Sequence, residues 1–268
     1  FRVPLWPTIA ALVLGLLFLL PFPTWYSIST FITTTTVFTY IIGGPSLMTL
    51  RRTAPNANRP IKLPAASVIG AIATIAAFLI VYWSTFYSLW FAAALIFAGL
   101  PLFYMYTMVN RYGASRTAGI ISGIVYWAIL IVATYFLIYL PIIAPTGWPV
   151  NDNLIKLKPI YIIDFVSYVA IMAATTIGFT LYVASTARDR DTAMKHVRAG
   201  WWVVATIFSA YVLSFLGYFN YVFQTSIIPF PWDTIIAALV ALGLYLYGSY
   251  SGILTEDLVV ALRELGGV

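Results

Sequence analysis

The sequence predicts an all-α, polytopic membrane protein with about eight transmembrane helices. Of its 268 residues, 62% are apolar and only 8% are charged, whereas a soluble globular domain carries about 25% charged residues. So few charges cannot cover a water-exposed surface, which excludes soluble enzymes and nucleic-acid-binding proteins. The strands of a membrane barrel alternate apolar and polar residues, and runs such as residues 71–80 do not. The spans are therefore expected to be helices.

The gaps between charged residues set the number of spans, because an ionised side chain at the bilayer centre is costly. Residues 3–50 and 63–110 are two gaps of 48 uncharged residues, and each holds two helices of about 20 residues. Four later gaps of 35, 23, 34 and 22 residues each hold one helix. Helices are expected at about 7–20, 26–50, 65–81, 89–109, 118–140, 160–187, 200–221 and 234–250.

Helix-breaking residues and tryptophans mark several of these ends. The first helix stops at Pro21-Phe22-Pro23, the second contains Gly43-Gly44-Pro45, and the third turns at Ser84-Thr85. Tryptophans are enriched where helices meet the membrane–water boundary. Four of them fall at predicted helix ends: Trp83, Trp90, Trp148 and Trp232.

Lysine and arginine predict the orientation of the chain. With eight spans both termini lie on one side, and Lys and Arg accumulate in cytoplasmic loops. The opposite side carries only Lys156 and Lys158. We therefore expect a multi-pass protein of the cell membrane with both termini in the cytoplasm. The twelve cations on the cytoplasmic side are Arg2, Arg51, Arg52, Arg59, Lys62, Arg111, Arg116, Arg188, Arg190, Lys195, Arg198 and Arg263.

The composition also limits the chemistry. The chain has no cysteine and one histidine, His196, which removes disulfides, thiolate metal sites and haem held by paired imidazoles. No phosphate loop, metal-ligand cluster or nucleophile–base pair is visible. We therefore expect no cofactor and no enzymatic activity. Because residue 1 is Phe and the first helix begins almost at once, we expect the chain to be the C-terminal part of a longer protein.

The loop after the second predicted helix carries the most specific pattern. It reads Pro45-Ser-Leu-Met-Thr-Leu-Arg-Arg52, then Pro55, then Arg59-Pro60-Ile61-Lys62-Leu63-Pro64. This pattern resembles the loop between helices ten and eleven of the amino acid–polyamine–organocation (APC) superfamily permeases. Ile61 replaces the family's aromatic residue, and Asn56 stands where an acidic residue often follows the proline.

The resemblance implies part of an inverted-repeat, five-plus-five transporter fold, from about the ninth helix onward. Residues 1–110 correspond to helices nine to twelve, with the basic cytoplasmic loop at 51–64. Residues 111–254 form additional C-terminal hairpins, and 255–268 form a short amphipathic cytoplasmic tail. In this family helices one and six hold the substrate, and both would precede Phe1.

The second predicted helix contains the candidate substrate path. Thr33, Thr36, Tyr40 and Gly44 have helical spacing that places them on one face. They are expected to line a path or gate, since the family's tenth helix flanks the central path. The alternative is helix packing through small and hydroxyl side chains.

Charged residues elsewhere predict structural roles. In the basic loop, Arg51, Arg52, Arg59 and Lys62 are expected to face anionic lipid headgroups. Asp164 and Asp233 lie near helix starts, where a carboxylate complements the helix dipole. We expect capping from both, not proton transfer. The Arg188–Asp191 run and His196 predict a solvated turn.

Two functions from different classes remain open at this point. The resemblance implies an amino-acid permease-like secondary transporter that moves amino acids or related amines, with the missing N-terminal helices as partners. The alternative is a non-transporting accessory subunit of a larger membrane complex. Both place the chain in a lipid bilayer, and neither involves nucleic acid.

Overall fold

The computed structural model of the chain describes residues 5–19, 25–57, 59, 61, 63–144, 159–218, 226–255 and 259–260. Within these ranges the secondary structure is helical, and no strand occurs. The helices are α1 (Leu5–Leu19), α2 (Trp25–Tyr40), α3 (Gly43–Thr53), α4 (Ala66–Tyr82), α5 (Phe86–Leu102), η1 (Phe103–Met108), α6 (Val109–Tyr112), α7 (Arg116–Ala133), η2 (Thr134–Ile143), α8 (Pro159–Ser185), α9 (Arg190–Leu216) and α10 (Trp232–Ser251).

This architecture confirms an all-α polytopic membrane protein. Helical segments lie at each of the eight predicted positions. Five of the described segments are long and apolar enough to cross a membrane, and α4 is a shorter apolar helix. The five are Phe86–Tyr112, Arg116–Ile143, Tyr161–Ser185, Arg190–Leu216 and Trp232–Ser251.

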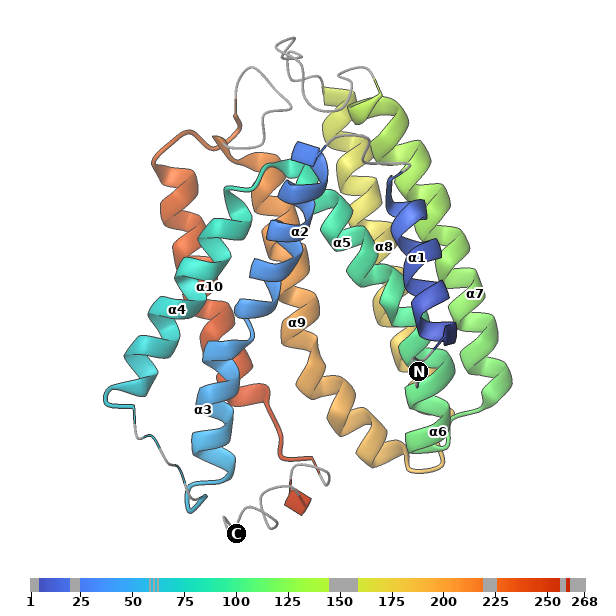
Figure 1. Cartoon of the computed structure of the whole chain (residues 1–268), viewed down its shortest axis with the longest axis vertical. Coiled ribbons are helices and arrows are strands. Elements are labelled where there is room, and N and C mark those ends of the chain that lie inside the picture. Colours follow the sequence, from blue (N-terminus) through green and yellow to red (C-terminus); the bar gives the residue numbers. More distant parts are fainter. Residues whose placement is uncertain are drawn as a thin grey trace.

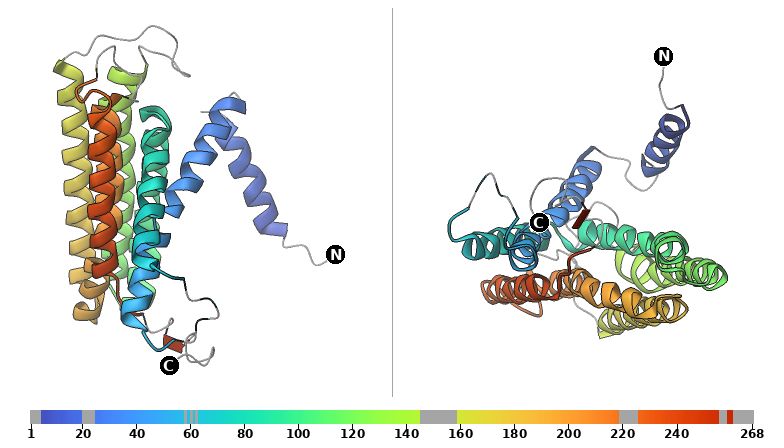
Figure 2. Two further views of the ribbon diagram at one scale, coloured as in Figure 1. Left: turned by 90° about the vertical axis from the view of Figure 1, so that its left-hand side faces the viewer. Right: turned by 90° about the horizontal axis from the view of Figure 1, so that it is seen from below.

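Most helices pack side by side in a bundle, and α2 is tilted relative to it while still packing against α4 and α5 (Figures 1 and 2). Helix α10 contacts α3, α4 and α9, while α5, α7, α8 and α9 pack in a second group. Seen end-on, α8, α9 and α10 form one layer, and α3, α4 and α5 form another (Figure 2). Helix α1 stands apart from both layers.

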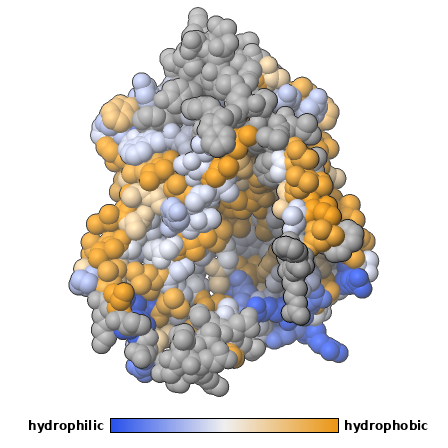
Figure 3. Space-filling model, in the orientation of Figure 1, coloured by the Kyte–Doolittle hydropathy of each residue, from blue (hydrophilic) through white to orange (hydrophobic). Residues whose placement is uncertain are grey.

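Hydrophobic side chains cover much of the visible surface, and hydrophilic ones gather near the ends of α3 and α6 (Figure 3). The end of α3, the end of α6 and the start of α9 lie at the same end of the molecule (Figure 1). The fold therefore brings the basic loops around residues 51, 111 and 188 to one end. The loop with Lys156 and Lys158, the tail after residue 260, and Trp148 lie outside the described residues.

Aromatic side chains fill the junction of α5, α8 and α9. Phe165 stacks on Phe215 with ring centroids 3.7 Å apart, and Phe86 meets Phe215 edge-on at 5.3 Å. Trp90 is buried in this region, so its prediction as a residue of the aromatic belt is wrong. Helix α5 begins at Phe86, three residues earlier than expected, which carries Trp90 one turn into the helix.

Hydroxyl groups join α8 to its neighbours inside the bundle. Interhelical hydrogen bonds of this kind hold membrane helices together, since lipid offers no competing partner. The π-helical segments η1 and η2 supply Tyr104 and Thr134. Each segment has a proline nearby: Pro101 precedes η1, and Pro141 lies within η2. A proline removes a backbone donor and its ring displaces the preceding turn. The pairs are Tyr104–Thr180 and Tyr126–Thr176, both at 2.8 Å, and Thr134–Tyr168 at 3.3 Å.

Candidate functional site

The second predicted span is not one helix but two, α2 and α3, separated by a turn at Ile41–Ile42. The Ile42 N–H donates to Thr39 O at 3.3 Å, and the Ser46 N–H donates to Ile42 O at 3.0 Å. Pro45 has no N–H to continue the ladder, which accounts for a break beside Gly43-Gly44-Pro45. Helices broken at membrane depth are a feature of transporter folds.

The start of α3 lies directly against α4. A Cβ atom at Gly44 would collide with the carbonyl of Gly70 and the hydroxyl of Thr74. Gly44 is therefore a packing residue, because only the absence of a side chain lets α3 approach α4 so closely. It does not share a face with the threonines of α2.

The other three residues of the predicted path lie on the open face of α2. Thr33, Thr36 and Tyr40 are exposed, with 62% of Tyr40 accessible. The opposite face, with Phe31 and Phe38, is buried toward the bundle. The Thr33 hydroxyl donates to its own helix, at Ser29 O. A hydroxyl-bearing face thus extends along α2 and ends at the helix break.

Helix α10 also contacts α3 through the small residues of its Gly248-Ser-Tyr-Ser-Gly252 segment. A Cβ at Gly248 would lie 2.9 Å from Pro45 Cβ, and one at Gly252 would collide with Thr49. The Thr49 hydroxyl lies 3.3 Å from Gly248 O. These contacts fix α3 in place relative to α4 and α10.

The arginines of the basic loop hold the ends of helices. Arg59 Nη2 donates to Ala54 O at 2.5 Å and to Leu50 O at 3.2 Å at the end of α3. Each of these carbonyls also accepts a main-chain N–H, Ala54 O from Ala57 and Leu50 O from Ala54. Arg52 holds the end of α10, donating to Tyr250 O at 3.0 Å and Gly252 O at 2.6 Å.

The other two cations of the basic loop are Arg51, whose contacts the structure describes, and Lys62, which it does not. Arg51 donates to Leu63 O at 2.8 Å, within the loop itself. Lys62 lies outside the described residues. The lipid role expected for this loop therefore stays a prediction, and three of its four cations have a structural one.

Asp233 forms a buried polar junction at the opposite end of the bundle. Its side chain is 1% exposed, and Oδ2 accepts from the Tyr82 hydroxyl at 2.5 Å and the Tyr218 N–H at 3.1 Å. Oδ1 accepts from the Thr234 N–H at 2.6 Å. The carboxylate lies in the first turn of α10, where it complements the helix dipole as expected. It also ties α4, α9 and α10 together.

Asp164 lies in the second turn of α8 and is half-buried. Among the residues that the structure describes, no group of three or more histidine or acidic side chains is placed to hold a metal ion. The described chain thus offers hydroxyls and main-chain groups at the broken helix. It places no carboxylate on the open face of α2.

Sequence reasoning anticipated the polar face of α2 but not the break that ends it. The signal was present in Gly43-Gly44-Pro45, which indicated a bend. The Arg52 cap and the Tyr82–Asp233 pair had no local signal, because each joins residues far apart in the chain.

The chain is 30% identical over 112 residues to the glutamate/serine transporter AimA of Bacillus subtilis (strain 168). The matched region is 41% of this chain and 21% of the transporter, so the match spans about a fifth of the relative's length. No protein-family model matches the chain, and no solved structure matches it significantly. The similarity supports a transporter-like membrane protein.

Proposed function

We propose that this chain is part of an amino-acid permease-like secondary transporter that moves amino acids or related amines across the cell membrane. The observation that carries the proposal is the partial similarity to a glutamate/serine transporter. The all-α membrane fold and the broken helix α2–α3 are compatible with it. Transport, not catalysis, is then the activity of the complete protein.

Within this proposal the chain supplies the end of an APC-type fold and further C-terminal helices. Residues 1–110 take the place of helices nine to twelve, and helices elsewhere in the complete transporter hold the substrate. Both termini face the cytoplasm. The gathering of the basic loops at one end of the bundle supports this orientation (Figure 1).

The hydroxyl face of α2, formed by Thr33, Thr36 and Tyr40, is proposed to line the substrate path. Lipid offers a hydroxyl group no hydrogen-bond partner beyond its own helix, whereas a polar path does. The face is open in the described chain, so it is available to the helices that complete the transporter. The break between α2 and α3 lies at the end of this face.

The test is uptake of labelled glutamate and serine by the complete transporter carrying Thr36→Val. Valine keeps the shape of threonine and removes the hydroxyl, so the loss of one hydrogen bond to substrate or water, about 1 kcal/mol, lowers uptake about fivefold. The matched control is Thr35→Val, whose hydroxyl donates to Phe31 O of its own helix at 2.9 Å.

Normal uptake with Thr35→Val and reduced uptake with Thr36→Val, at equal expression, supports the path. Equal uptake by both variants would mean that the hydroxyl face of α2 serves helix packing and does not line the substrate path. Absence of glutamate, serine or other amino-acid uptake by the complete protein would instead favour an accessory subunit.

A further inference from the structure

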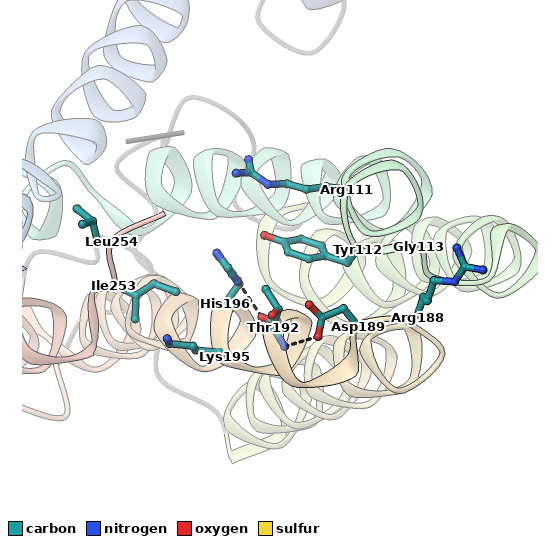
Figure 4. Close-up of a pocket in the computed structure, with 10 residues that line it drawn as sticks. All are labelled: Arg111, Tyr112, Gly113, Arg188, Asp189, Thr192, Lys195, His196, Ile253 and Leu254. Carbon is teal, nitrogen blue, oxygen red and sulfur yellow. Dashed lines mark hydrogen bonds between the residues drawn. The ribbon is translucent and has the colours of Figure 1, made fainter. Parts of the chain in front are cut away.

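A pocket of about 460 Å³ lies at the basic end of the bundle, away from the broken helix. Its walls come from the end of α6, the α8–α9 turn with the first turns of α9, and residues 253–254 after α10 (Figure 4). A second hollow of about 490 Å³ adjoins it, sharing Lys195 and Ile253 and adding one cation, Arg198, and one carboxylate, Asp191. The volume suits a small ligand or a lipid headgroup.

Positive charge predominates in this pocket. Arg111, Arg188 and Lys195 line it, and Asp189 is the one carboxylate among the lining residues. Asp189 already caps α9, since its Oδ1 accepts the Thr192 N–H at 3.1 Å. Hydrogen bonds from Thr192 hold the pKa of the Asp189 carboxyl below its usual value, so it stays ionised. The lining therefore keeps an excess of positive charge at neutral pH.

The pocket walls are fixed by contacts between the two loops that form them. The Arg188 N–H donates to Gly113 O at 3.2 Å, and the Ser115 N–H donates to the Thr186 hydroxyl at 3.2 Å. Gly113 has φ +65°, and a Cβ there would lie 3.1 Å from Arg188 Cβ. Glycine is needed at this position, and its turn brings the end of α6 against the loop that carries Arg188.

Aromatic and aliphatic side chains complete the pocket. The ring of Tyr112 lies 5.1 Å from the ring of His196, and His196 Nδ1 lies 2.8 Å from Thr192 O. In Figure 4 Arg111 extends from α6 and Lys195 from α9, on either side of these rings. Ile253 and Leu254 add aliphatic surface. Arg111 of α6 and Lys195 of α9 thus line the same pocket, beside the apolar side chains of Ile253 and Leu254.

We propose that this pocket binds a phosphate group, with Arg111 and Lys195 as its principal cationic contacts. Guanidinium groups match phosphate oxygens in pairs, and an ammonium adds a point charge. The group is carried either by an anionic phospholipid at the membrane surface or by a small soluble phosphate compound. Basic pockets between membrane helices are suited to lipid headgroups. This site is independent of the transport function proposed above.

The experiment uses the purified 268-residue chain in a nonionic detergent, titrated with short-chain phosphatidylglycerol and separately with inorganic phosphate. Arg111→Gln and Lys195→Gln are each expected to weaken binding about fivefold, equivalent to about 1 kcal/mol. Lys195→Arg is expected to retain it. Arg190→Gln is the matched control, because Arg190 is an exposed cation of the same turn whose side chain does not line the pocket.

The two sources give different results. Saturable phosphatidylglycerol binding that inorganic phosphate does not displace assigns the site to a lipid headgroup. Saturable binding of inorganic phosphate that competes with the lipid assigns it to a soluble compound. The proposal is overturned when the unmodified chain binds neither probe saturably. It is also overturned when Arg190→Gln weakens binding as much as Lys195→Gln, at unchanged unfolding midpoints.

Discussion

Asp233 joins the ends of three helices, and its replacement by asparagine is expected to destabilise the fold. Each carboxylate oxygen accepts a main-chain N–H, Oδ1 from Thr234 and Oδ2 from Tyr218. A main-chain N–H cannot turn around to accept a hydrogen bond. In either orientation of the new side chain, its NH₂ group therefore faces a donor. One of these two half-buried main-chain donors then loses its acceptor whichever way the amide is oriented.

The expected cost follows from that lost acceptor. A donor or acceptor left without a partner in a buried site costs about 1–3 kcal/mol, and the side chain at position 233 is 1% exposed. We expect Asp233→Asn to lower the free energy of unfolding by about 2 kcal/mol, roughly thirtyfold in the folding equilibrium. Tyr82→Phe is expected to cost about 1 kcal/mol, because Oδ2 keeps the Tyr218 N–H. The two changes should not add, since they affect one junction.

The assay is unfolding of the purified chain in detergent micelles, followed by tryptophan fluorescence. Asp164→Asn is the matched control, because Asp164 is a half-buried carboxylate near the start of another helix. The reasoning is refuted when Asp233→Asn shifts the midpoint no more than Asp164→Asn does. Strict additivity of Asp233→Asn and Tyr82→Phe would also contradict it.

Two further predictions concern the basic loop and the topology. Arg59→Gln is expected to lower unfolding stability by about 1–2 kcal/mol, because the end of α3 loses its guanidinium cap; Arg190→Gln in the same unfolding assay should have little effect. Asn56→Cys is expected to react with a membrane-impermeant thiol reagent only from the cytoplasmic side, and Asn153→Cys only from the outer side, in a chain without other cysteines. Labelling of both from one side would contradict the proposed orientation.

The helical architecture was predictable because lipid restricts the choices of the chain. A bilayer core offers no hydrogen-bond partners, so each apolar segment must satisfy its backbone as a helix. Gaps between charges therefore located the helical segments. The same reasoning could not split residues 26–50 into α2 and α3, because hydropathy does not distinguish a straight helix from a broken one. Gly43-Gly44-Pro45 indicated weakness in the helix, but the packing of Gly44 on α4 depends on the tertiary fold.

The other features that the sequence did not predict depend on residues far apart in the chain. Arg52 binds carbonyls about 200 residues away, and Tyr82 meets Asp233 across 151 residues. A local pattern contains only one side of such a pair. Arg52 caps α10, but its place in a basic loop predicted only that it would face anionic lipid headgroups. The Arg188–Asp191 run likewise read as a solvated turn. It forms a pocket only because the glycine turn after α6 packs against it.

The central claim is that this chain forms part of an amino-acid transporter and does not transport alone. Alternating access requires two repeats or bundles moving around a shared site, and the match spans about a fifth of the length of the transporter it resembles. The most direct test is uptake of labelled glutamate and serine into liposomes containing either residues 1–268 or the complete transporter. The account predicts insertion of both proteins, with saturable uptake by the complete transporter alone. Saturable uptake by residues 1–268 alone, or none by the complete protein, would contradict it.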